Sequence, residues 1–266
     1  MKIECVVICV NYSDFLAESL PTNRHQFDRL VVVTTPEDKL TQRLCENYHV
    51  HCIQTDVFDT AHGNFRKGAA INVGLAALSR DAWLCHMDAD IVLPPKTRRL
   101  LEQSQLDPSC IYGADRFMIK SAEEWFTHLQ RPKVLHQHWE AKDESGYFIL
   151  TDNHRFGVRV AGVSGWVPIG FFQLWHSSKC VRYPEGHTTA GREDMLMGMQ
   201  WPRSKRVLLP EILVYHLESE ANSAMGANWL GRTTPTFARP TPNPLTLSEL
   251  WTYLKLHWRQ LVSRSI

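Results

Sequence analysis

The chain has 266 residues, of which 44% are hydrophobic and 21% charged, so it can bury a substantial core and is neither disordered nor of low complexity. The net charge of +1 gives no support to a wholesale electrostatic grip on nucleic acid or on an anionic membrane. Seven scattered cysteines without a CxxC pair predict reduced thiols. No stretch approaches the roughly 18 apolar residues of a membrane span. We therefore expect a soluble, cytoplasmic protein without integral membrane association.

The first half of the chain alternates short β-branched runs with helical patterns. The runs are near-continuous apolar segments, as expected of strands buried on both faces of a parallel sheet. Strands are predicted near residues 3–10, 30–34, 50–54, 82–87 and 110–114, with helices over 36–47 and 65–78 and from about 94. This alternation predicts an α/β fold with a mostly parallel sheet flanked by helices, whose ligand crevice lies beyond the carboxyl ends of the strands.

The second half of the chain does not continue this alternation of strands and helices. Aromatic residues cluster over 166–175, a charged helix start follows at 191–194, and an apolar strand ends the region at 207–216. Residues 219–244 are rich in Gly, Ser, Thr, Asn and Pro, which predicts a long, flexible loop of the kind that often forms a lid. Apolar positions at helical spacing over 248–261 predict an amphipathic helix.

Two carboxylates, Asp88 and Asp90, stand where the predicted strand over 82–87 emerges from the sheet. Two anions this close repel one another and resist desolvation, so a divalent cation is their natural compensation. Oxygen ligands of this type suit Mg²⁺ or Mn²⁺, which keep open positions for phosphate oxygens. The alternative is an acidic turn that caps the helix near Pro94.

Three further segments stand in a particular order around this pair. They are FRKGAAINVGL at 65–75, directly before the acidic strand, then GFFQLW at 170–175 and GREDM at 191–195. With Asp88-Ala89-Asp90 they resemble the metal-dependent glycosyltransferases of the GT-A fold, especially family 2 and the related galactosyl- and N-acetylgalactosaminyltransferase-like domains. The resemblance covers about residues 3–220.

The resemblance also implies a domain organisation. A single GT-A domain is expected over residues 1–218, with a nucleotide-sugar-binding half at 1–115 and a mixed acceptor and catalytic half at 116–218. The lid-like loop and the amphipathic helix follow over 219–266.

The resemblance implies a metal site. Asp88 is similar to the first acid of the family's metal motif, near the donor ribose and the metal, and Asp90 is similar to the direct metal ligand. His216 looks like the histidine that completes the site in many relatives, although a single His after an apolar strand is often structural. The implied cofactor is Mn²⁺ or Mg²⁺.

Donor contacts are implied at five matching positions. Lys67 lies in the region with which relatives hold the donor base and phosphates, and a cation beside free helix N–H groups favours anions; a solvated basic turn is its alternative. Asn11 and Asp56 match family positions around uracil and ribose, although both residue types also dominate ordinary turns. Gln173 and Trp175 are expected along the donor-sugar or acceptor cleft, unless they belong to the core.

Glu193 and Asp194 resemble the family's acidic pair, in which a carboxylate takes the proton from the attacking acceptor hydroxyl. The resemblance makes Asp194 the general base, with inversion at the anomeric carbon, and gives Glu193 a role in acceptor binding. The alternative is that negative charge here merely complements a helix dipole. Arg232, in the predicted loop, is expected to close over the donor diphosphate, unless the loop is a plain connector.

The leading interpretation is a metal-dependent glycosyltransferase that moves a sugar from a nucleotide-sugar, expected to be a UDP-sugar, to an acceptor hydroxyl. A nucleotidyltransferase of similar fold is the alternative enzyme, although no Gly-rich basic loop follows the first strand. A binding module that kept the fold without turnover is a third interpretation. The acceptor stays open among a glycan, a protein, a lipid-linked intermediate, a small molecule and a hydroxymethylated base of phage DNA.

Overall fold

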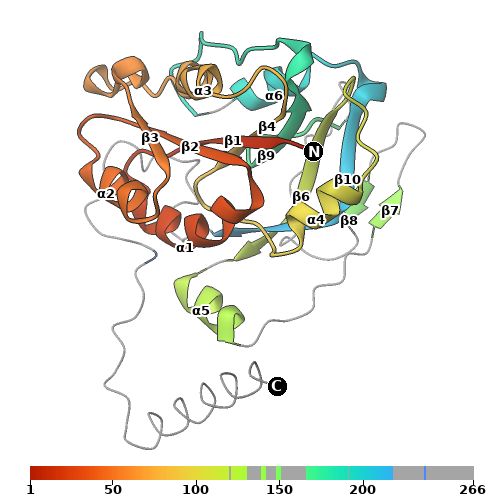
Figure 1. Cartoon of the computed structure of the whole chain (residues 1–266), viewed down its shortest axis with the longest axis horizontal. Helices are drawn as coiled ribbons and strands as arrows, with labels where there is room; N and C mark the ends of the chain where they lie inside the picture. The colour runs from red at the N-terminus through yellow and green to blue at the C-terminus, as the bar shows by residue number, and fades with distance from the viewer. Residues whose placement is uncertain are drawn as a thin grey trace, which may run out of the picture.

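An eight-stranded sheet forms the centre of the molecule, and helices cover both of its faces (Figure 1). The structure is a computed structural model, and it describes residues 1–119, 121–130, 166–190, 192–217 and 237, with the backbone of 139–141 and 148–150. The predicted α/β architecture, a mostly parallel sheet flanked by helices, is confirmed. No helix in the described ranges is long and apolar enough to cross a membrane.

The strands follow one another in the sheet in the order β3-β2-β1-β4-β9-β6-β10-β5. Their bounds are β1 (Ile3–Ile8), β2 (Arg29–Thr34), β3 (His51–Gln54), β4 (Trp83–Asp88), β5 (Ile91–Val92), β6 (Ile111–Ile119), β9 (Phe172–His176) and β10 (Arg206–Leu217). A second sheet pairs β7 (Trp139–Ala141) with β8 (Phe148–Leu150).

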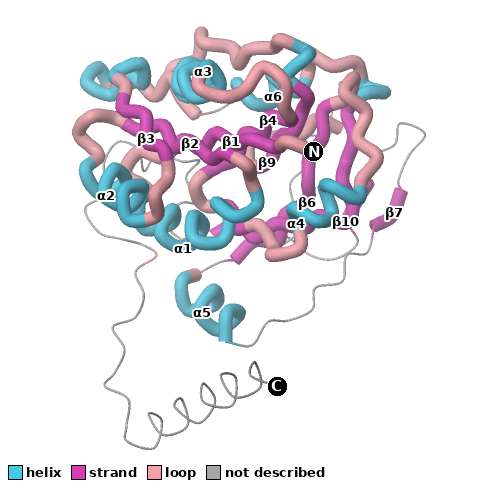
Figure 2. Tube along the Cα trace, in the orientation of Figure 1, coloured by secondary structure: helices cyan, strands magenta, loops and turns pink. Residues whose placement is uncertain are grey.

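Helices α1 and α2 pack on one face of the sheet, and α3 and α6 pack on the other (Figure 2). The described helices are α1 (Ser13–Asn23), α2 (Lys39–Asn47), α3 (Lys67–Ala76), α4 (Thr97–Gln103), α5 (Ala122–Gln130) and α6 (Glu193–Gly198). Short 3₁₀ helices cover Arg24–Gln26, Asp56–Phe58, Thr60–His62, Ser177–Lys179 and Arg203–Lys205.

Strand direction decides where the functional side chains gather. Strands β1 to β4 are parallel to one another. Strand β9 runs antiparallel between β4 and β6, β10 is parallel to β6, and β5 is antiparallel to β10. The carboxyl ends of β1, β4 and β10 therefore meet at one edge of the sheet, together with the segment that enters β9. This edge carries the predicted acidic pair.

The core lies on both faces of the sheet because successive side chains of a strand point to opposite faces. In β1, Cys5 and Val7 pack toward α1 and α2, whereas Val6 packs toward α3. Helix α3 approaches the sheet closely at Gly74, where a Cβ would stand 2.2 Å from Cγ2 of Val6. The glycine therefore lets α3 lie directly on the sheet.

One helix boundary differs from the sequence-based expectation, and one predicted strand contains an irregularity. The helix predicted to begin at Pro36 begins at Lys39, because Asp38 is its N-cap and accepts a hydrogen bond from the Thr41 N–H at 3.1 Å. Strand β10 continues through Pro210, which lacks a backbone donor, and its pairing register with β6 shifts there.

The longer elements that were not predicted are α1, α5 and β9, and the short strands β5, β7 and β8 and the 3₁₀ helices were not predicted either. Helix α1 has no side-chain cap hydrogen bond at its N-cap Tyr12 and contains Pro21, a residue that is unfavourable inside a helix. Strand β6 crosses the predicted boundary between residues 115 and 116, so the two predicted halves share one continuous sheet. The predicted loop and helix over 219–266 lie outside the described residues, except Phe237, whose ring packs against Phe15 at a centroid distance of 4.8 Å.

Candidate active site

The acidic pair lies at the carboxyl end of β4, as expected. Asp88 is the last residue of the strand and Asp90 lies in the turn to β5, with side chains 29% and 14% exposed. Oδ1 of Asp90 is buried and has no hydrogen-bond partner among the described residues. Neither carboxylate caps α4, whose N-cap is Lys96. A charged oxygen left without a donor is costly, so this position suits a bound cation.

Lys67, the first residue of α3, is buried beside the acidic pair. Its Nζ donates a hydrogen bond to Oδ1 of Asp88 at 2.7 Å and lies 4.0 Å from Oε1 of Glu193. Burial lowers the pKa of Lys67, but the charges of Asp88 and Glu193 outweigh burial and raise that pKa above its ordinary value. Lys67 is therefore a buried cation that joins α3, β4 and α6, and not a solvated basic turn.

Glu193, the first residue of α6, is 1% exposed. Neither of its carboxylate oxygens has a hydrogen-bond partner in the described part of the chain. Burial raises the pKa of Glu193, and the nearby Lys67 opposes that rise. The negative charge of this buried carboxylate is therefore balanced mainly by the ammonium of Lys67.

Asp194 is half-buried and its carboxylate is held by two backbone donors. The N–H of Gly170 donates to Oδ2 at 2.7 Å and the N–H of Met195 donates to Oδ1 at 2.6 Å. Burial, together with the charges of Asp90 and Asp194, raises the pKa of Asp88 against the opposing effect of Lys67. Asp194 thus belongs to the same charged group as the acidic pair.

His216, near the end of β10, lies beside Asp90, with its Nε2 3.3 Å from Oδ2 of that carboxylate. Its Nδ1 lies 2.8 Å from Nη1 of Arg116. A guanidinium can only donate, so Nδ1 accepts and the hydrogen of a neutral imidazole is on Nε2. In this arrangement His216 gives Asp90 a hydrogen, and the ligand role that the resemblance implied stays a prediction.

Among the residues that the structure describes, no group of three or more His, Cys, Asp and Glu side chains is arranged to hold a metal ion. The two carboxylates still fit a divalent cation, because Oδ1 of Asp90 lacks a donor and Asp88 is partly exposed.

The family model of Glycosyl transferase family 2 matches residues 4–166, which is more than half of the chain. The chain belongs to glycosyl transferase family 2. It is therefore a glycosyltransferase, and the predicted family and its GT-A type of fold are confirmed.

Solved structures of sugar transferases resemble this family 2 chain at low identity. Glucosyl-3-phosphoglycerate synthase from Mycobacterium tuberculosis, in complex with Mn²⁺, UDP-glucose and phosphoglyceric acid, is 13% identical, with a TM-score of 0.46 over 81% of this chain and 71% of that chain. Mannosyl-3-phosphoglycerate synthase from Rubrobacter xylanophilus is 15% identical, with a TM-score of 0.35 over 46% and 42%. None of the curated proteins matches this chain.

The predicted donor contacts of this transferase fall into three groups. Asn11, exposed and in a left-handed conformation (φ 57°) after β1, and Asp56, exposed after β3, both lie at the carboxyl edge of the sheet. Gln173 and Trp175 are 0% and 1% exposed. The structure therefore places these two inside the core instead of along a cleft, because β9 is an interior strand. Arg232 lies outside the described residues.

Several residues around the transferase site escaped sequence reasoning. Arg116, His86 and Tyr183 lie beside His216, Asp88 and Gln173, respectively. His86 is fully buried, and burial followed by the charge of Lys67 lowers its pKa well below the ordinary value. The available signal was a polar side chain inside an apolar strand, which applies to Arg116 and His86 but not to Tyr183.

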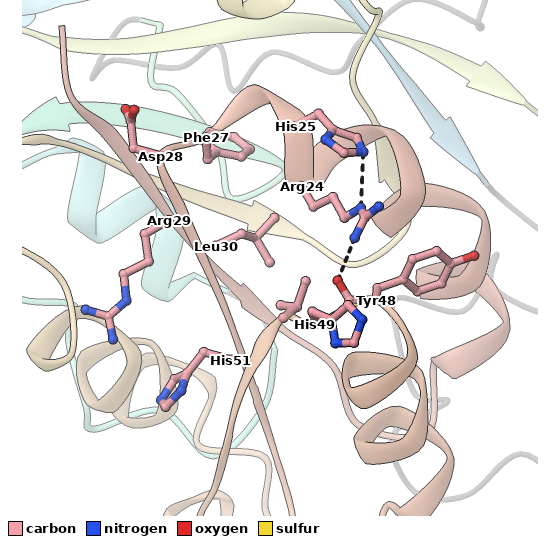
Figure 3. A pocket seen from close by; sticks show the side chains of 10 residues that line it. Arg24, His25, Phe27, Asp28, Arg29, Leu30, Tyr48, His49 and His51 are labelled. Atoms are coloured by element: carbon pink, nitrogen blue, oxygen red, sulfur yellow. Dashed lines mark hydrogen bonds between the residues drawn. The ribbon is translucent and has the colours of Figure 1, made fainter.

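A cavity of about 350 Å³ lies at the opposite edge of the sheet, by the amino ends of β2 and β3 (Figure 3). In Figure 3, Arg29 and His51 extend to one side of the strand ends, whereas Arg24 and Tyr48 lie on the other. Arg24 donates to the Tyr48 carbonyl at 2.6 Å. The basic groups therefore do not converge on one point, and the cavity is separate from the acidic pair.

Proposed function

We propose that this family 2 glycosyltransferase transfers a sugar from a UDP-sugar to an acceptor hydroxyl with the help of Mn²⁺ or Mg²⁺, and that it inverts the anomeric carbon. The proposal rests on the contacts of Lys67 at the carboxyl edge of the sheet. Lys67 donates a hydrogen bond to Asp88 and lies close to Glu193, and the charge of Asp194 acts on the same group. This edge is where ligands bind in open α/β folds.

On the donor side, Asp88 and Asp90 would hold the divalent cation, and His216 would orient Asp90. When bound, the cation would neutralise the negative charge of the departing nucleoside diphosphate. Lys67 limits the negative charge that the anionic donor meets, because its ammonium already balances Asp88 and Glu193. The exposed side chains of Asn11 and Asp56 stand at the same edge and are proposed to contact the nucleoside.

On the acceptor side, Asp194 would take the proton from the attacking hydroxyl, which is a poor nucleophile until it is deprotonated. Two backbone N–H groups fix the direction of its carboxylate. Glu193 is buried, so we propose that it acts through Lys67 and not through direct contact with the acceptor. Direct attack assisted by one base leads to inversion.

The proposal is tested with a panel of nucleotide-sugars, Mn²⁺ and hydroxyl acceptors, with detection of the product by mass. We expect release of a nucleoside diphosphate, whereas a nucleotidyltransferase would release inorganic diphosphate. Asp194→Asn is expected to keep donor binding and to lose transfer, by about 10²-fold or more, the usual contribution of a general base. Full turnover in Asp194→Asn would contradict the assignment of the base.

A further inference from the structure

Gln173 is a buried amide at the point where the segment before β9 meets α6. Its residue is 0% exposed, so it cannot contact a substrate in this structure. We propose that Gln173 is a positioning residue that holds Asp194 in place for proton transfer. The inference rests on the proposed function of Asp194 as the base.

The amide nitrogen of Gln173 donates hydrogen bonds to two backbone carbonyls, one on each side of the hydrogen bond between Gly170 and Asp194. Nε2 donates to the carbonyl of Pro168 at 2.7 Å and to the carbonyl of Asp194 at 2.8 Å. Pro168 stands two residues before Gly170, whose N–H donates to the Asp194 carboxylate at 2.7 Å. Gln173 therefore fixes the backbone on either side of the hydrogen bond that orients the base.

The other end of the Gln173 amide links this region to α3. Its Oε1 accepts a hydrogen bond from the hydroxyl of Tyr183, whose residue is 2% exposed. The side chain of Asn72 in α3 binds both backbone groups of Tyr183, each at 2.9 Å. Helix α3 also begins with Lys67, so hydrogen bonds connect the helix of the buried cation to the base.

Close packing strengthens the connection between α3 and the segment around Tyr183. A Cβ on Gly68 would stand 2.1 Å from the carbonyl oxygen of Pro184. The helix start therefore rests directly on the backbone that follows Tyr183.

An amide is the only common side chain that satisfies this position. Two N–H groups face two carbonyls and one oxygen faces a hydroxyl, which matches the donors and acceptors of glutamine. A carboxylate would place negative charge against both carbonyls, and methionine would leave the carbonyls without a donor. We therefore expect a shape-conserving variant to move Asp194 without removing any group that touches the donor.

The experiment compares Gln173→Met and Gln173→Glu with the wild type. We expect kcat for transfer to fall by about 10²-fold, the usual cost of a misplacement of about 1 Å, with the donor KM unchanged. Amide hydrogen exchange at Gly170 and Met195 should become faster in both variants. Tyr183→Phe keeps the two Nε2 donors and should lose less of kcat.

Leu174→Ala is the matched control, since Leu174 is buried in the same strand and packs in the core on the opposite face from Gln173. If it lowers kcat as much as Gln173→Met, general destabilisation explains the loss and the inference fails. Wild-type kcat or unchanged exchange at Gly170 in Gln173→Met also overturns it. A wild type that transfers no sugar from any donor overturns the proposed function, while the exchange at Gly170 still decides whether Gln173 positions Asp194.

Discussion

At the scale of single residues, the site is built from charged side chains that are mostly buried and lie close to one another. Lys67 holds Asp88 at 2.7 Å and stands 4.0 Å from Glu193, whose oxygens have no hydrogen-bond partner among the described residues. Removing one partner of a buried ion pair leaves an uncompensated charge, which costs more than the pair contributes. The stability of this site should therefore depend strongly on Lys67.

We expect Lys67→Met to lower the free energy of unfolding by about 3 kcal/mol near pH 8, because Glu193 and Asp88 lose their cation. Burial raises the pKa of Glu193, and Lys67 opposes this rise, so the pKa climbs further in the variant. The raised pKa means that the folded state binds the proton more tightly, so the loss should shrink as the pH falls toward 5. Urea unfolding at the two pH values measures this difference.

The double variant Lys67→Met with Glu193→Gln is the control for this pH dependence. It removes both charges of the pair, so it should recover part of the lost stability at pH 8. A loss that is equal at both pH values, or no recovery in the double variant, would show that Lys67 does not compensate Glu193.

A second prediction concerns which ring nitrogen of His216 carries the hydrogen. Because Arg116 donates to Nδ1, Nε2 carries the hydrogen toward Asp90, and Mn²⁺ bound to the site should have no directly bonded protein nitrogen. Arg116→Met frees Nδ1 to carry the hydrogen, so a bonded nitrogen should then appear. Electron spin echo measurements of bound Mn²⁺ detect such a nitrogen. A nitrogen bonded to Mn²⁺ in the wild type would contradict this prediction and support His216 as a metal ligand.

At the scale of elements, strands were easier to predict than the direction of their side chains. The apolar runs of β1, β2 and β4 were recognisable because both faces of these strands are buried. Strand β9 was missed because its aromatic residues, together with Gln173, were expected along a cleft or in the core, and neither expectation specified a strand. Burial of a short aromatic segment depends on its neighbours in the sheet, which local sequence does not show.

Helix starts were predictable where a charged group marks them. Lys67 and Glu193 each begin a helix near a place that sequence motifs indicated, and the structure brings these two residues within 4.0 Å of one another. Arg116 was not predicted, because its role arises from the pairing of β6 with β10, which are far apart in the chain.

At the scale of the whole molecule, the net charge of +1 conceals a concentrated group of charges. Asp88, Asp90, Glu193 and Asp194 gather at one edge of the sheet around the buried Lys67. Parallel strands make this gathering possible, since the carboxyl ends of β4 and β10 meet at that edge beside the segment that enters β9. Family membership establishes the reaction class, and this edge is the part of the molecule proposed to carry it out.

The most direct test of this account is a calorimetric titration of UDP with and without Mn²⁺. The wild type should bind UDP more tightly with Mn²⁺, and Asp90→Ala should lose this gain by about tenfold or more, the usual cost of disturbing a metal site. Asp81→Ala, an exposed carboxylate just before β4, is the matched control and should bind as the wild type does. Mn²⁺-independent binding of UDP, or a full Mn²⁺ gain in Asp90→Ala, would contradict the account.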